Sequence, residues 1–247
     1  NSNNAESKEF TYEITRADFP KDDNARTYSK IKEEDEESFV SFMKRHVCFD
    51  DARLTEYLKQ VKKIFSHKAC FIPNVGLAYL FAKALRNTEV LIIHIEHDWL
   101  HYSDFTKHGL LSAFTEATNN SEKNYILVLD GLNITQPECG LRPLLNLING
   151  DVPILEGCGL KFPSNLTIMA TVLSTAEDNA VGLKLSPSYF SKWFAIGDPS
   201  EESDKIILPE NFWDDEVIED CGYVEPSDLS KERVNERAEL LDKYLEF

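Results

Sequence analysis

The sequence has few of the features that mark disulfide-rich or membrane-spanning proteins. Its five cysteines are an odd number and no two are close together, which argues against a disulfide framework and against a cysteine-rich zinc site. No apolar run approaches the length of a membrane span, and residues 1–9 are polar, without a signal-peptide core. We therefore expect an intracellular, cytoplasmic protein with reduced thiols and no membrane association.

Basic residues are also scarce. The chain has 26 Lys and Arg against 43 Asp and Glu, a formal net charge of −17, and much of the acid lies in residues 32–37 and 200–246. Contacts to phosphates need clustered Lys and Arg, so nucleic acid is an unfavourable partner for this chain alone. Solubility, a protein partner or a homo-oligomer would explain the acidic balance, and we expect a protein partner or a homo-oligomer.

The length of 247 residues and the hydrophobic fraction of 42% allow one large buried core. We expect three parts: an acidic N-terminal extension over residues 1–50, an α/β domain over 51–200, and an acidic, partly helical segment over 201–247. Within the extension, only Phe10, Tyr12 and Ile14 alternate like a short strand.

Residues 51–200 alternate short apolar runs with helical patterns, which predicts an α/β fold with a mainly parallel sheet sandwiched by helices. The predicted strands are 69–72, 90–95, 125–130 and 165–172. The predicted helices are 51–65, 78–85, 109–118, 141–148 and a short one at 186–193, which a Ser cap and a Pro in the first turn would open.

The apolar run 125–129 ends at Asp130 and Gly131. A strand buried on both faces would place Asp130 at the carboxyl edge of the sheet, where open α/β sheets bind ligands. Asp130 then resembles the first half of a nucleotide-site Asp-Glu pair, with Gly131 in place of the Glu. The alternative is a strand-end carboxylate that caps a turn.

Residues 69–85 read as strand, glycine-containing loop and helix, which is the order of a phosphate-binding loop. The loop is Pro73-Asn-Val-Gly76, and it has no lysine. A plain strand-to-helix turn is the alternative, with backbone amides that could hold a weaker anion.

Residues 54–199 resemble the AAA+ NTPase modules, and among them the McrB-like branch associated with modified-DNA restriction. The resemblance rests on the order and spacing of segments whose counterparts are the phosphate loop, the Pro-Asp-Trp loop, the Asp-Glu-Met-Asn stretch, the strand leading to the sensor Asn and the segment ending in Asp-Arg. Those segments are 71–78, 96–105, 130–133, 162–171 and 185–193. The resemblance implies a P-loop NTPase fold with a nucleotide site at Asn74, Gly76, Asp130 and Asn133.

The departures from the family pattern fall on the chemistry. Leu77 replaces the phosphate-loop Lys, Ala78 replaces the magnesium-holding Thr, and Gly131 replaces the Glu that would orient the attacking water. Leu173 stands near the position of the sensor Asn, and residues 191–192 stand at that of Asp-Arg. The resemblance therefore implies a degenerate site with no catalytic residue and no resident cofactor, with at most weak nucleotide or Mg²⁺ at Asp130.

These observations favour a catalytically degenerate AAA+-like domain that serves as a scaffold or assembly module in a larger, defence- or restriction-type system. One alternative is an atypical Mg²⁺-dependent NTPase that uses Asp130 with a lysine from elsewhere, such as Lys68 or Lys192. The other is a nucleic-acid-handling module, for which the helix face with Lys59, Lys62 and Lys63 is the basic cluster to consider.

The histidines between residues 94 and 108 raise a separate hypothesis, a zinc or iron site. Its candidate ligands are His94, His97, His101 and His108, with Asp98 and Asp104 among them. Their spacing matches no known helix pair of ligands, and His94 lies in a predicted strand while the others follow in a loop. The sequence allows these side chains to bind one metal ion but does not require it.

Overall fold

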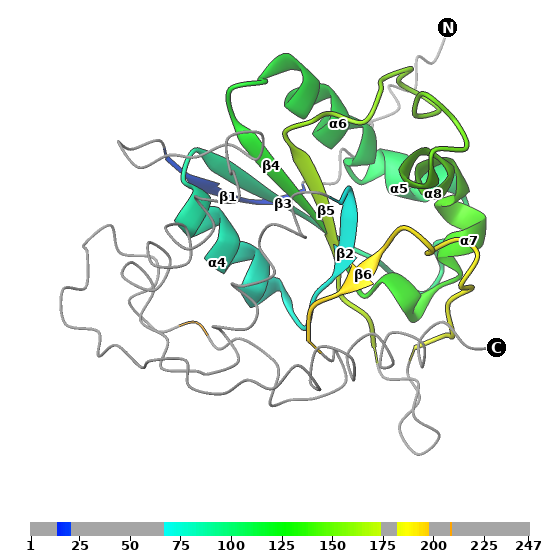
Figure 1. The fold of residues 1–247 in the computed structure, drawn as a ribbon. Coiled ribbons are helices and arrows are strands. Elements are labelled where there is room, and N and C mark those ends of the chain that lie inside the picture. The colour runs from blue at the N-terminus through cyan, green and yellow to red at the C-terminus, as the bar shows by residue number, and fades with distance from the viewer. Residues whose placement is uncertain (1–13, 21–66, 174–181, 198–207, 209–247) are drawn as a thin grey trace, which may run out of the picture.

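The computed structural model describes residues 14–20, 67–173, 182–197 and 208, which form a six-stranded sheet with helices on both faces (Figure 1). The strands are β1 (Thr15–Phe19), β2 (Ala69–Phe71), β3 (Thr88–His94), β4 (Asn124–Asp130), β5 (Leu166–Ala170) and β6 (Phe194–Ala195), in the order β1-β3-β4-β5-β2-β6. All neighbours are parallel except β1, which pairs antiparallel with β3. The predicted mainly parallel α/β sheet is confirmed, and the four predicted strands lie in it.

The helices form two layers. On one face lies α4 (Val75–Leu85), and on the other face lie the remaining described helices (Figure 1). These are α5 (Tyr102–Lys107), α6 (Leu110–Asn119), α7 (Pro137–Gly140) and α8 (Arg142–Asn149), and a 3₁₀ helix, η2 (Leu132–Ile134), follows β4. The connection from β2 to β3 therefore crosses one face, whereas those from β3 to β4 and from β4 to β5 cross the other.

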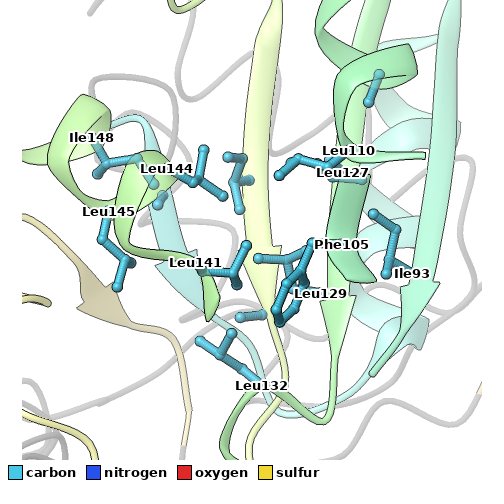
Figure 2. Packing of buried hydrophobic residues seen from close by; sticks show 14 of the residues in the cluster. Ile93, Phe105, Leu110, Leu127, Leu129, Leu132, Leu141, Leu144, Leu145 and Ile148 are labelled. Atoms are coloured by element: carbon cyan, nitrogen blue, oxygen red, sulfur yellow. The ribbon is translucent and has the colours of Figure 1, made fainter. Parts of the chain in front are cut away.

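Strand β4 shows why its sequence is a continuous apolar run. Tyr125, Leu127 and Leu129 face the layer of α5–α8, while Ile126 and Val128 face α4, and all five side chains are buried. Figure 2 shows leucines of β4 packed with residues of α5, α6 and α8. A parallel strand covered on both faces has no polar side, so the usual alternation of polar and apolar residues is absent.

Ion pairs fix the edge strand β1 to the sheet and to α6. The Arg16 guanidinium donates to both carboxylate oxygens of Glu116 at 2.7 and 2.8 Å, and to Glu89 at 2.8 Å. Lys123 Nζ lies 2.8 Å from both Glu89 and Asp18. Partial burial alone would raise the pKa of Glu89, but its hydrogen bonds to Lys123 and Arg16 hold that pKa below its usual value. Residues 15–19, which lie within the expected N-terminal extension, are part of the sheet through their backbone pairing with β3.

The predicted short helix at 186–193 is wrong. The segment forms successive tight turns instead, in which Tyr189 N donates to Ser186 O at 3.1 Å and Trp193 N donates to Phe190 O at 2.9 Å. These turns place the Phe190 and Trp193 rings against Phe71, with ring centroids 5.7 and 4.9 Å from it. Burial of the two aromatic rings outweighs the helix-start signal of Ser and Pro.

The structure contains the predicted helices at 78–85, 109–118 and 141–148, with shifted ends. The structure places helices over most of the predicted ranges 109–118 and 141–148, and α4 begins three residues earlier than predicted, at Val75. The predicted helix at 51–65 and the expected C-terminal segment 201–247 lie outside the described residues, apart from residue 208. Among the helices that the structure describes, none is long and apolar enough to cross a membrane.

Candidate functional site

At the carboxyl edge of the sheet, the chain segments that leave the neighbouring strands β2 and β5 run to opposite faces. These strands are adjacent and parallel. The chain leaves β2 into α4 on one face, whereas the segment that follows β5 contributes Leu185, Phe190 and Trp193 to the core on the opposite face. Open α/β sheets bind ligands at such a switch point, outside the carboxyl ends of the strands. This edge is therefore the candidate functional site.

Asp130 is the last residue of β4, and both of its carboxylate oxygens are hydrogen-bonded within the chain. His94 Nδ1 lies 2.9 Å from Oδ2, and because a carboxylate only accepts, the imidazole N–H donates. The Thr171 hydroxyl donates to Oδ1 at 2.6 Å and accepts from Gly131 N at 2.8 Å. The Asp130 side chain is one-third exposed, at 33%. Asp130 thus joins the ends of β3, β4 and β5.

Gly131 forms a left-handed turn after β4, with φ of 77° and ψ of 40°. A side chain at position 131 would have enough space, because a Cβ there would lie 4.0 Å from Ile95 O, its nearest neighbour. A residue other than glycine would instead pay about 1–2 kcal/mol for the left-handed conformation. The turn is therefore built around the glycine, and the second carboxylate of an acid pair does not fit this backbone without strain.

The segment between β2 and α4 has only three residues, 72–74. Phosphate-binding nests commonly combine right- and left-handed residues, and no residue from 72 to 76 has a positive φ. Phe71 stands at the first glycine position of the Gly-x₄-Gly-Lys-[Ser/Thr] spacing, yet it remains in β2 and is 1% exposed. The backbone amides of this segment do not form the cradle of a phosphate loop.

Leu77 and Ala78 occupy the positions of the family's phosphate-loop Lys and Thr. Both are 0% exposed and belong to the apolar cluster between α4 and the sheet. Their side chains therefore contribute to the core, and at these two positions no polar group is available to a phosphate or a metal.

The other predicted site residues lie at the same edge as Asp130. Asn74 is the N-cap residue of α4, without a side-chain capping hydrogen bond, and Gly76 lies in the first turn of that helix. Asn133 is fully buried in η2. The structure therefore confirms the predicted placement of Asp130 and residues 73–76 at one edge. Whether Asn74, Gly76, Asp130 and Asn133 bind a nucleotide stays a prediction.

The Asn133 amide is engaged by backbone groups on two segments. Its Nδ2 donates to Leu173 O at 2.9 Å and to Leu183 O at 3.1 Å, and its Oδ1 accepts from Leu173 N at 2.6 Å. Leu183 N also donates to the Asn133 carbonyl at 2.7 Å. Asn133 thus connects η2 to the chain on either side of residues 174–181.

The two lysines of the enzyme hypothesis are placed away from Asp130. Lys68 immediately precedes β2, and Lys192 precedes β6, so both lie at the amino ends of parallel strands. Lys68 Nζ donates to Leu147 O at 3.2 Å. Asp130 lies at the carboxyl ends of the same sheet.

The histidines do not gather around one point. Among the described residues, no group of three or more His, Cys, Asp or Glu side chains could hold a metal ion. Asp104 caps the start of α5, where its carboxylate accepts hydrogen bonds from Leu100 N and His101 N at 3.1 and 2.9 Å. The His108 ring packs against the Trp99 ring, with 4.1 Å between the ring centroids. Asp104 and His108, two of the candidate metal ligands, thus contribute to the structure of α5 and its ends.

Sequence reasoning missed two contributors to this edge. No local pattern marks Thr171, and the sequence suggests His94 only as a metal ligand. His94 could have been recognised, because it ends β3 and pairs in register with Asp130 at the end of β4. The charge of Asp130 also affects Tyr79 on α4. Burial raises the pKa of Tyr79, and the negative charge of Asp130 raises that pKa further.

No protein-family model matches the chain, and no curated protein matches it either. The fold and the geometry of the carboxyl edge are therefore the observations on which a function can be proposed.

Proposed function

We propose that the chain is a catalytically degenerate AAA+-like domain of the McrB-like branch, which acts as a scaffold or assembly module in a larger defence- or restriction-type system. The observation that supports this most is the burial of Leu77 and Ala78 in the core beneath a three-residue turn. The positions that would meet phosphate and metal instead stabilise the domain.

The energetics of phosphoryl transfer make these replacements decisive. That chemistry depends on positioning and on charge stabilisation, for which a lysine, a metal-holding hydroxyl and an acid pair are needed. Of those four groups only Asp130 remains, and it is bound by His94 and Thr171. Loss of one preorganised stabilising group typically costs about 10² to 10³ in rate, so the loss of three leaves no useful turnover.

An ordered α/β core can serve as a scaffold without this chemistry. Both sheet faces are covered, and the acidic sequence favours a protein partner over nucleic acid. The atypical-NTPase alternative has less support, because Lys68 and Lys192 lie at the opposite edge from Asp130. The link to defence or restriction rests on the family resemblance.

Thermal unfolding in the presence of MgATP or MgGTP tests the degenerate site. A ligand at about 100 times its Kd stabilises the folded state by about 2.7 kcal/mol, which raises Tm by roughly 5–10 °C in a chain of this size. We expect millimolar nucleotide to leave Tm unchanged in the wild-type chain and in Asp130→Ala alike. A rise of several degrees in the wild type that disappears in Asp130→Ala would contradict the proposal.

A further inference from the structure

A chain of hydrogen bonds joins three neighbouring strands at the carboxyl edge. It runs from His94 at the end of β3, through the Asp130 carboxylate at the end of β4, to the Thr171 hydroxyl just after β5 and on to Gly131 N. Backbone hydrogen bonds from Leu132 N to Thr171 O and from Thr171 N to Leu129 O reinforce it. The turn after β4 is thereby tied to the segment after β5.

His94 holds its place through Asp130. Its side chain is 60% exposed, so packing restrains the ring little, and the 2.9 Å hydrogen bond from Nδ1 to Asp130 Oδ2 orients it. The imidazole presents the positive end of an N–H bond to the carboxylate. Oδ2 lies on the more exposed side of Asp130, because His94 is exposed whereas Thr171, the partner of Oδ1, is buried.

Magnesium needs near-octahedral oxygen coordination and is usually held by one or two carboxylates together with substrate phosphates. Here Ala78 and Gly131 supply no ligand, and both oxygens of Asp130 already accept hydrogen bonds. A cation that approaches Oδ2 therefore competes with the His94 N–H for this carboxylate.

We propose that His94 takes the place of a divalent cation beside Asp130, so that the ends of β3, β4 and β5 are held together without metal or nucleotide. The inference deepens the proposed function, because an assembly module that needs no nucleotide requires an edge that is ordered in its absence. A surface ion pair without this role is the alternative, and such a pair would neither exclude a cation nor respond to one.

Binding of Mn²⁺ alone to the purified full chain, followed by electron paramagnetic resonance without nucleotide, tests the inference. The acidic chain will bind some Mn²⁺ elsewhere, so the quantity to compare is the part of the binding that depends on Asp130. Wild type and Asp130→Asn are expected to bind Mn²⁺ equally. His94→Ala is expected to bind roughly tenfold more tightly than His94→Ala/Asp130→Asn, the amount that displacing a hydrogen bond to a charged group typically costs.

His97→Ala is the matched control, because it removes an exposed imidazole from the same stretch and is expected to behave as the wild type. If Asp130→Asn weakens Mn²⁺ binding in the wild-type background, His94 does not exclude the cation and the inference is wrong. It is equally wrong if His94→Ala gains no binding that depends on Asp130. The wild-type comparison needs no substitution at His94, so it can still refute the inference if His94→Ala fails to fold, and His94→Gln then replaces His94→Ala in the second comparison.

This result is separable from the proposed function. Turnover of ATP by the chain would overturn the scaffold proposal, whereas Mn²⁺ binding at Asp130 in the wild-type chain without any turnover would overturn only the role of His94.

Discussion

Replacing Leu77 with lysine is expected to destabilise the domain by about 3–5 kcal/mol rather than to create a phosphate loop. The substitution restores the residue type that the family has at this position. However, Leu77 is 0% exposed and packs in the cluster that α4 forms with the sheet. An ammonium group placed there loses its hydration and gains no partner, and the apolar contacts of Leu77 are lost as well. Urea unfolding at neutral pH measures the effect.

Leu77→Met is the matched control, because it keeps an apolar side chain of similar volume and is expected to cost less than about 1.5 kcal/mol. A Leu77→Lys protein as stable as the wild type would show that this side chain can reach solvent. If that protein also bound MgATP, the backbone of residues 72–76 would be able to hold phosphates, contrary to the geometry described above.

Asn133→Ala is expected to cost about 2–3 kcal/mol, because it leaves partly buried backbone groups of Leu173 and Leu183 without the amide. The wild-type amide serves the Leu173 carbonyl, the Leu173 N–H and the Leu183 carbonyl, and Asn133 is 0% exposed. Each buried polar group left unpaired typically costs about 1–3 kcal/mol. Denaturant unfolding monitored by tryptophan fluorescence reports the loss.

Asn119→Ala provides the comparison, since Asn119 is an exposed asparagine at the end of α6 and its replacement is expected to change stability by less than about 0.5 kcal/mol. A cost below about 1 kcal/mol for Asn133→Ala would mean that water replaces the amide at this position. The hydrogen bonds of Asn133 would then not be what holds η2 to the segments around residues 173 and 183.

The sheet could be predicted because its strands are buried on both faces. A run such as 125–129 has no solvated side, so its apolar character is unbroken and its end at Asp130 is visible in the sequence. The parallel arrangement brings the carboxyl ends of the predicted strands to one edge, so the sequence predicts that Asp130 lies at the same edge as residues 73–76. Local apolar pattern and parallel topology were sufficient for this much.

Contacts that depend on long-range geometry could not be predicted. The bond between Thr171 and Asp130 joins residues 41 positions apart and follows from the register of β4 against β5. The turns at 186–193 likewise arise from burial of Phe190 and Trp193 against Phe71, whereas the local sequence favours a helix start. In both cases tertiary packing decides, and no local signal reports it.

Phosphate release by the purified chain with ATP or GTP and Mg²⁺ tests the central claim most directly. Because Leu77, Ala78 and Gly131 stand where charge-stabilising groups are needed, we expect release indistinguishable from that of Asp130→Ala. Turnover in the wild-type chain that Asp130→Ala abolishes would contradict the account and identify the carboxyl edge as an unusual but working nucleotide site.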